Sequence, residues 1–551
     1  MKVGLCLDGW TIIASPRRMV LGAAALAASF GMTSVAQAAD CGSLAALSLP
    51  NTVVTQAEEV QAGTLTVSPA LTLTDLPAFC RVAGVIRPTG DSDIRFEVWL
   101  PRSDWNGRYQ QVGNGGLAGS VLYQNLAPQL QQGFAVASTD DGHQASELDG
   151  SWALGHPEKV RDFGHRAVHL TSMVGKLLVA AFYGREAAYS YFTACSEGGR
   201  EAHMEAQRFP SDFDGILVGS PANHWTDLMA RFVWDQQALL GTEESYIPPA
   251  KLPAIQAATL AACDALDGVP DGVATDPRRC HWDPAALLCP DGSDDNTCLT
   301  MPQAQALRAI YAGPSDPSTG QQISTGYERT GENSGNWNSY IVGNTPGNAL
   351  QLLFSSGFYQ GFVFEDPDWD FRTFDFHRDV ALTRQKLAAT LDATDPDLRA
   401  FQRRGGKMIQ YHGWIDASPQ PRGSIQYYES VVANQASRWG ERHGLSRTQR
   451  FYRLFMAPGM EHCLGGPGPN VFGQPFATVP PPSRDAQHDI LAALVTWVEL
   501  GRAPAKIVAT KYVNDDPAQG IQVQRPLCPY PAEAQWTGDG STNDPDRFRC
   551  E

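Results

Sequence analysis

Short apolar runs alternate with amphipathic stretches in two separate parts of the chain. In the first part, runs typical of buried strands lie at 95–100, 109–112, 134–138, 188–195 and 215–219. In the second part the pattern returns at 407–411 and 451–456, and an apolar helix is predicted over 485–500, ended by Gly501. Strands that alternate with helices favour a mostly parallel sheet covered on both faces, so the sequence predicts the α/β class.

Between these two parts, residues 224–394 lack the alternation. The stretch is rich in Asp, Gly, Pro, Asn and Trp and contains four closely spaced cysteines. We therefore expect a large inserted lid domain over 224–394, seated over the carboxyl edge of a sheet whose two parts span 39–223 and 395–551.

Residues 1–38 have the pattern of a signal peptide. Arg17 and Arg18 precede an apolar run at 20–30, and the Ala-Gln-Ala sequence at 36–38 offers a cleavage site. We expect cleavage after Ala38 and a secreted or periplasmic protein, with either the general or the twin-arginine route open. No other apolar run approaches the roughly 20 residues needed to span a bilayer.

The formal net charge of the chain is −17, although the signal segment is itself basic. The mature chain is therefore strongly acidic, which disfavours nucleic acid and anionic membrane as partners. Ten of the eleven cysteines follow the signal segment, and an even number in an exported protein predicts five disulfides. A zinc site would need pairs at CxxC spacing, which the sequence lacks.

Ser196 stands at the junction between the strand at 188–195 and a helical sequence. Its neighbours Ala194, Gly198 and Gly199 are small, as required where a sharp turn lifts a serine hydroxyl clear of a sheet. Ala194 replaces the first glycine of the usual pattern. A serine here could also be a simple helix N-cap, but the paired glycines favour the nucleophile elbow of an α/β hydrolase.

A nucleophilic serine needs a histidine base and a carboxylate that orients it, in the chain order Ser, acid, His for this fold. Four histidines follow the proposed insertion: His412, His443, His462 and His488. His443 and His488 lie in polar stretches and are expected at the surface, whereas His462 lies on a Gly/Pro-rich loop directly after a strand. Asp416 follows the strand at 407–411 in the same way, so we predict a Ser196, Asp416 and His462 triad.

Cysteines flank both ends of this predicted triad. Cys195 directly precedes Ser196, and Cys463 directly follows His462. A Cys195–Cys463 disulfide would hold the nucleophile and the base in the geometry that proton transfer requires. Two unrelated structural cysteines are hard to reconcile with this placement.

The combination of Cys-Ser, an intervening Asp and a late His-Cys resembles the tannase and feruloyl esterase family, which includes a bacterial mono(2-hydroxyethyl) terephthalate hydrolase. The resemblance extends over nearly the whole mature chain. It implies an α/β-hydrolase fold with a lid and the hydrolysis of a small-molecule aromatic ester through an acyl-enzyme. It also implies four local disulfides: Cys41–Cys80, Cys263–Cys280, Cys289–Cys298 and Cys528–Cys550.

The resemblance further implies an oxyanion hole made by two backbone amides. One is that of Glu197, directly after the serine. The other comes from the glycine-rich loop at 112–119, where we favour Gly116 and place Gly115 next. Two converging donors are needed because negative charge develops on the carbonyl oxygen in the transition state.

An Asp/Gly-rich loop between Cys263 and Cys280 has the carboxylate spacing of a site for a hard cation. By resemblance it is a structural Ca²⁺ site, with side-chain ligands Asp264, Asp267 and Asp271 and carbonyl ligands Val269 and Val273. It does not follow the EF-hand pattern, because position 12 counted from Asp264 is Thr275 and not glutamate.

The aromatic-rich stretch at 337–376 offers candidates for an acyl pocket, among them Phe354, Phe358, Tyr359 and Trp369. A terephthalate monoester carries a free carboxylate and would need a basic partner, yet no Lys or Arg lies between Arg329 and Arg372. We therefore rank feruloyl- or galloyl-type phenolic esters above terephthalate monoesters. The alternative from a different functional class is a catalytically inactive, hydrolase-like binding protein.

Overall fold

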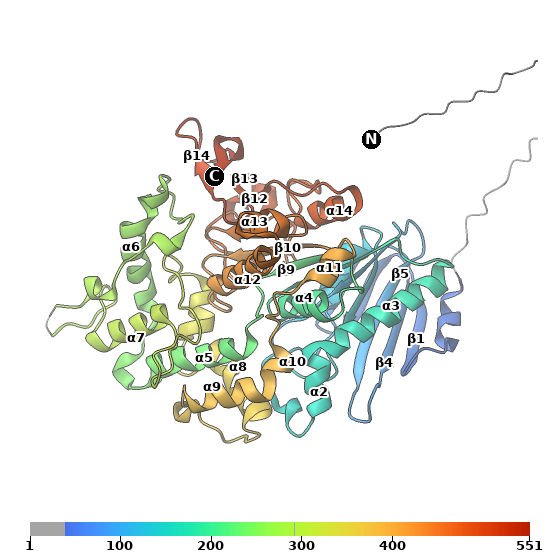
Figure 1. Ribbon diagram of the computed structural model, residues 1–551, viewed down its shortest axis with the longest axis horizontal. Coiled ribbons are helices and arrows are strands. Elements are labelled where there is room, and N and C mark those ends of the chain that lie inside the picture. Colours follow the sequence, from blue (N-terminus) through green and yellow to red (C-terminus); the bar gives the residue numbers. More distant parts are fainter. Residues whose placement is uncertain (1–38, 291) are drawn as a thin grey trace, which may run out of the picture. The chain divides into compact units, whose positions relative to one another are not determined.

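A nine-stranded sheet organises the computed structural model, which describes residues 39–290 and 292–551 (Figure 1). The strands follow the order β1-β4-β5-β7-β6-β8-β9-β10-β11. Their bounds are β1 (Thr52–Val60), β4 (Phe79–Ile86), β5 (Ile94–Pro101), β6 (Arg108–Val112), β7 (Ala135–Thr139), β8 (Tyr189–Cys195), β9 (Gly215–Gly219), β10 (Lys407–Gly413) and β11 (Tyr452–Ala457). Every predicted strand occurs within two residues of its expected bounds.

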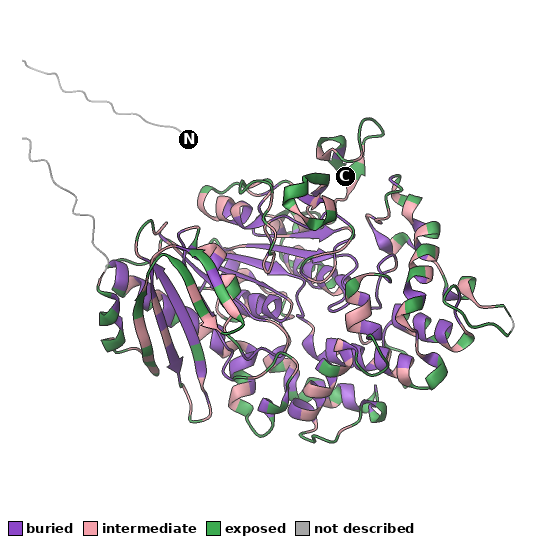
Figure 2. Cartoon of the chain, turned by 180° about the vertical axis from the view of Figure 1, so that it is seen from behind, coloured by how far each residue is buried: buried purple, intermediate pink, exposed green. Residues whose placement is uncertain are grey.

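Neighbouring strands are parallel from β7 through to β11 and antiparallel from β1 through to β7. The mostly parallel α/β sheet is thus confirmed, with an antiparallel edge that the sequence analysis did not predict. Figure 2 shows the inner strands mostly buried, whereas every residue of β1 is exposed or half-buried. Because no residue of β1 is buried, its sequence lacks the continuous apolar run of an inner strand.

Helices cover both faces of the sheet because successive strand side chains point to opposite sides. Phe192 and Ala194 of β8 pack with α3 (Ala167–Tyr183), α4 (Glu197–Arg208) and α12 (Pro421–Trp439). Tyr191 and Cys195 of the same strand pack on the other face with α1 (Tyr123–Leu130) and α14 (Ile490–Leu500). A three-layer α/β architecture, which the α/β-hydrolase fold shares, follows from this two-sided packing.

The last helix is shorter than the sequence predicted. It begins at Ile490 and not at residue 485, because the Asp489 carboxylate caps it by accepting the Ala492 N–H at 2.9 Å. Residues 485–489 form a turn instead. Gly501 ends the helix as expected, in the left-handed conformation at φ 69°.

Residues 220–406, which we call the insert, connect β9 to β10. Their longer helices are α5 (Trp225–Leu240), α6 (Leu252–Cys263), α7 (Met301–Ala312), α8 (Leu350–Phe358) and α9 (Arg378–Thr383). In Figure 1 these helices gather at one side of the sheet. They contribute most of two apolar clusters, which Leu117, Trp152 and Phe163 from before the insert and Ala417 from after it complete. The insert coincides with the stretch in which the sequence lacks alternating strand and helix patterns. Its role as a lid stays a prediction.

The remaining elements are short or peripheral. They are the hairpin β2 (Gly63–Ser68) and β3 (Leu71–Leu76), the pairs β12 (Ile507–Tyr512) with β13 (Ile521–Leu527) and β14 (Ala534–Trp536) with β15 (Phe548–Cys550), and the helices α2 (Pro157–Arg161), α10 (Ala389–Leu391), α11 (Arg399–Arg403) and α13 (Glu441–Thr448). The predicted signal peptide lies outside the described residues. Within the described part, no helix has the length and apolarity to cross a bilayer.

Candidate active site

Ser196 occupies a sharp turn between β8 and α4. Its backbone has φ 67° and ψ −125°, and its N–H donates to the Gly219 carbonyl at 3.0 Å. A side chain on either following glycine would collide with backbone, since an added Cβ would lie 2.6 Å from the Asn114 oxygen at Gly198 and 2.6 Å from the Gly219 oxygen at Gly199. The small residues are therefore required by the turn, which fits a nucleophile elbow and not an ordinary N-cap.

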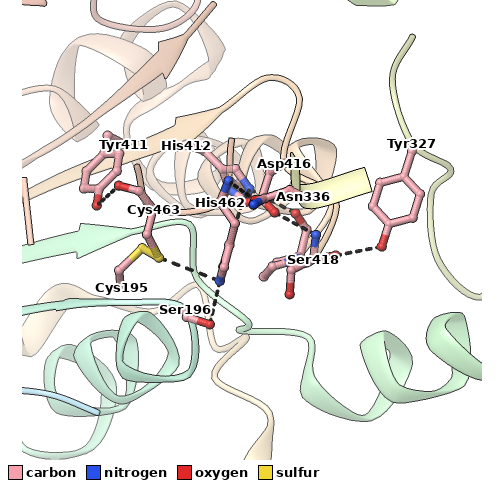
Figure 3. A network of polar contacts seen from close by, with 12 residues as sticks. Cys195, Ser196, Tyr327, Asn336, Tyr411, His412, Asp416, Ser418, His462 and Cys463 are labelled. Carbon is pink, nitrogen blue, oxygen red and sulfur yellow. Dashed lines mark hydrogen bonds and ion pairs between the residues drawn. A yellow bond between two sulfur atoms is a disulfide. The ribbon is translucent and has the colours of Figure 1, made fainter. Parts of the chain in front are cut away.

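The three predicted triad residues form one hydrogen-bonded chain (Figure 3). Ser196 Oγ lies 2.8 Å from His462 Nε2, and His462 Nδ1 lies 2.8 Å from Asp416 Oδ2. Asp416 follows β10 and His462 follows β11, so the parallel strands deliver both groups to the same sheet edge as Ser196. This arrangement can pass the serine proton to the histidine while the carboxylate orients the ring.

A second histidine contacts the same carboxylate, which the sequence analysis did not predict. His412 is fully buried, and its Nε2 lies 3.2 Å from Asp416 Oδ2 while its Nδ1 lies 2.7 Å from Ser424 Oγ. Burial favours a raised pKa for Asp416, but the charge of His462 and hydrogen bonds from both histidines outweigh it and hold the pKa well below its ordinary value. The i, i+4 spacing of His412 and Asp416 was the available signal.

The loop that carries His462 is anchored on three sides. Cys463 forms the expected disulfide with Cys195, and its carbonyl accepts the Tyr411 hydroxyl at 3.3 Å. From the insert, Asn336 Oδ1 accepts the backbone N–H of His462 at 2.7 Å. Sequence reasoning missed Asn336 because nothing local marks a contact across 126 residues. The other four expected disulfides are also present.

The two residues expected to form the oxyanion hole lie at the same cavity as Ser196. Gly116 and Glu197 both line it, and neither amide donates a hydrogen bond to another described residue. Gly116 adopts φ 61°, and a Cβ there would lie 2.7 Å from the backbone oxygen of Glu147. The loop conformation therefore needs glycine at this position. Both amides are thus available to a ligand oxygen.

The cavity above Ser196 encloses about 300 Å³ and has a mainly apolar wall. Its aromatic lining consists of Trp225, Phe232, Tyr340, Phe354 and Phe476. Glu147 is its exposed carboxylate, and none of the described lining residues is Lys or Arg. Burial, followed by the charges of Asp416 and Glu147, raises the pKa of the Tyr340 hydroxyl, so this group stays protonated at neutral pH.

Only one of the aromatic candidates named from the sequence reaches the cavity, namely Phe354. Phe358 and Tyr359 are fully buried in the apolar cluster of the insert, and Trp369 packs beside Tyr359 at a ring distance of 5.0 Å. Composition alone could not separate wall residues from core residues, because both are aromatic.

The Asp/Gly-rich loop closed by Cys263–Cys280 borders a separate cavity of about 160 Å³. Four of the five predicted ligands line that cavity, namely Asp267, Val269, Asp271 and Val273. Burial raises the pKa of Asp271, against the lowering charge of Arg525, and the nearby Asp267 and Asp264 add to the rise. Carboxylate and carbonyl oxygens are the donors that a hard cation prefers. Asp271 also accepts a hydrogen bond from Arg525 at 2.7 Å.

Comparison with known proteins places the chain among esterases. A family model described as tannase and feruloyl esterase matches residues 80–551. An uncharacterized esterase from Xanthomonas campestris pv. campestris is 47% identical over 94% of this chain and 92% of its own. A probable feruloyl esterase B-2 from Aspergillus terreus is 31% identical over 97% of this chain and 98% of its own. The crystal structure of feruloyl esterase B from Aspergillus oryzae superposes with a TM-score of 0.84 at 30% identity, covering 93% of this chain and 99% of that one.

Proposed function

Because the chain belongs to the tannase and feruloyl esterase family and is a carboxylic ester hydrolase, we propose that it cleaves aromatic acid esters through Ser196, His462 and Asp416. The observation that carries the proposal is the continuous hydrogen-bonded chain of these three residues beside an aromatic cavity. Complete catalytic equipment of this kind argues against an inactive binding protein.

In the proposed mechanism, Ser196 Oγ attacks the ester carbonyl and passes its proton to His462 Nε2. Asp416 holds the ring through Nδ1 and stabilises the imidazolium that forms. The amides of Glu197 and Gly116 receive the oxyanion. His462 then protonates the leaving alcohol, and a water molecule activated by the same histidine releases the acid from the acyl-enzyme.

The cavity supports a neutral aromatic acyl group such as a hydroxycinnamoyl or galloyl group. Aromatic rings pack well against the Tyr340 and Phe354 side chains. A terephthalate monoester would bring its free carboxylate toward Glu147. None of the described residues that line the cavity is Lys or Arg, so this carboxylate would have no positive partner there. Repulsion between the two carboxylates and the missing counter-charge disfavour that substrate. A phenolic hydroxyl, in contrast, could donate a hydrogen bond to the Glu147 carboxylate.

A panel of methyl ferulate, methyl gallate, a terephthalate monoester and a short aliphatic ester tests this proposal. We expect kcat/KM for at least one phenolic ester to exceed that of the aliphatic ester by about tenfold or more, equivalent to roughly 1.4 kcal/mol of transition-state binding. Preference for the aliphatic ester would refute the aromatic pocket, and preference for the terephthalate monoester would reverse the ranking.

A Ser196→Ala variant tests the serine mechanism separately. It should lose more than a thousandfold in kcat yet still bind substrate, because the hydroxyl forms the reacting bond. A fluorophosphonate probe should label the wild type at Ser196. An unlabelled wild-type protein would favour the inactive binding protein.

The protein is proposed to be exported and to carry a structural Ca²⁺ in the loop around Asp267. Five disulfides support an oxidising compartment. The oxygen-rich donor set supports the cation, which would brace the insert away from the reacting ester. Asp264, Asp267 and Asp271 would hold it with the carbonyls of Val269 and Val273.

A further inference from the structure

A buried carboxyl cluster lies directly behind the proposed oxyanion hole. Asp141, Glu197 and Glu201 place one carboxyl oxygen each within 4.8 Å of the others, and none of the three is more than 2% exposed. Glu197 and Glu201 lie one turn apart on α4, and Asp141 follows the end of β7. The triad mechanism uses none of these carboxyl groups, so their burial needs another explanation.

Glu201 contacts the glycine loop that carries Gly116. Its Oε2 accepts the backbone N–H of Asn114 at 3.0 Å. A Cβ on the preceding residue, Gly113, would lie 2.3 Å from this same oxygen. The close approach of the carboxylate to the loop therefore depends on the missing side chain at Gly113.

Asn114 is the point where the loop meets the start of α4. Its carbonyl accepts the Gly198 N–H at 3.1 Å, and its side-chain amide donates to the Thr139 carbonyl at 2.8 Å. Gly198 lies two residues after the nucleophile, so Asn114 links both arms of the oxyanion hole. The contact with Glu201 secures this link from the next turn of the helix.

Glu201 lies among other charged groups that are themselves buried. Arg200, which is fully buried, pairs with Glu197 and also donates to the Phe163 carbonyl at 2.8 Å. Burial, and then the charges of Glu201 and Glu197, raise the pKa of Asp141 well above its ordinary value. Burial raises the pKa of Glu197 as well, so the cluster favours protonated carboxyl groups. A protonated carboxyl can donate to a neighbouring carboxylate oxygen, and Asp141, Glu197 and Glu201 each have at least one side-chain oxygen without another partner among the described residues.

We propose that Glu201 is a positioning residue of the oxyanion hole. Its carboxylate fixes the Asn114 peptide, and through it Gly115 and Gly116, against the first turn of α4. The proposal rests on the proposed serine mechanism. Glu201 does not touch the reacting atoms, so its effect is expected on transition-state binding and not on substrate binding.

A pair of variants isolates the contact, because both remove the charge and only one keeps an acceptor for the Asn114 N–H. Glu201→Leu should lower kcat for methyl ferulate by about 10- to 100-fold with KM changed less than threefold, somewhat below the loss of a whole oxyanion donor. Glu201→Gln should retain kcat within about threefold of the wild type. A boronic acid that forms a tetrahedral adduct with the serine should lose affinity in parallel with kcat/KM in Glu201→Leu, while inhibition by the planar product ferulate stays unchanged.

Glu205→Leu is the matched control. Glu205 lies on the same helix, is equally buried and has no partner for its carboxyl oxygens among the described residues. Its loss should leave kcat within about threefold. Should Glu201→Leu fail to fold, Glu201→Met, which has a longer unbranched side chain and also lacks the carboxylate, should lower kcat to a similar degree.

Three results would overturn the role of Glu201: unchanged kcat in Glu201→Leu, an equal loss in Glu205→Leu, or a Glu201→Gln variant as impaired as Glu201→Leu. Ser196→Ala separates a failure of the proposed serine mechanism from a failure of the positioning role of Glu201. Activity that survives in Ser196→Ala would refute the proposed mechanism, whereas an inactive Ser196→Ala beside a fully active Glu201→Leu would refute only the positioning role.

Discussion

Asn336 Oδ1 accepts the backbone N–H of His462, the histidine of the proposed triad, at 2.7 Å. The contact joins the insert to the catalytic loop across 126 residues of sequence. Beside it, Glu461 Oε1 accepts the Gly335 N–H at 2.9 Å, so two consecutive residues of each segment are paired. The insert therefore helps to position His462, the proposed base, and also lines the cavity.

Replacing Asn336 should weaken catalysis through this contact. Asn336→Ala leaves a half-buried N–H without its acceptor, at a cost of about 1–3 kcal/mol. We expect kcat/KM to fall roughly tenfold in an ester assay. Asn338→Ala is the control, because Asn338 bonds Asn344 within the same segment and should have little effect. Equal losses in the two variants would mean that the segment as a whole, and not the contact, matters.

The two histidines on Asp416 should differ strongly in importance. Asp416→Asn removes the group that orients His462 and should lower kcat by about 10⁴-fold. His412→Phe leaves the Asp416–His462 bond in place, so we expect a loss of only about tenfold. His203→Phe, another fully buried histidine replaced in the same way, controls for general destabilisation. A loss in His412→Phe as large as in Asp416→Asn would place His412 in the proton relay itself.

Asp140 should make stability depend on pH. Burial raises the pKa of its carboxyl to about 7, despite hydrogen bonds from the Gly142 and Arg95 amides. Because the folded pKa exceeds the unfolded value of about 3.9, the contribution of Asp140 is full below about pH 4 and is lost as pH rises to about 7. Asp140→Asn should therefore gain melting temperature relative to the wild type across that window, with little difference below it. A constant difference at all pH values would contradict the raised pKa.

Chelation should lower the melting temperature if the loop around Asp267 binds Ca²⁺. Binding to the folded state alone adds stability by mass action. We expect a higher melting temperature in Ca²⁺ than in chelator for the wild type, and no such difference for Asp267→Asn. Asp368→Asn, at an exposed carboxylate of the insert, should behave as the wild type. Identical melting curves with and without chelator, and no metal by elemental analysis, would exclude the site.

Local patterns were sufficient for much of this protein. The strand at 188–195 followed by Ser196 and paired glycines predicted the elbow, because a tight turn restricts its own residues. The positions of Asp416 and His462 after their strands predicted the triad, since the carboxyl ends of parallel strands meet at one edge. Because a triad brings Ser196 and His462 close together, the cysteines beside them predicted the Cys195–Cys463 disulfide.

Contacts that depend on distant segments were decided only by the tertiary structure. The contact of Asn336 with His462 and that of Glu201 with Asn114 carry no local signal, because each partner looks like an ordinary polar residue in its own segment. Likewise, Phe354 lines the cavity while Phe358 is buried, although both have the same side chain. Packing between segments, which no single stretch of sequence contains, determines which of these groups meet.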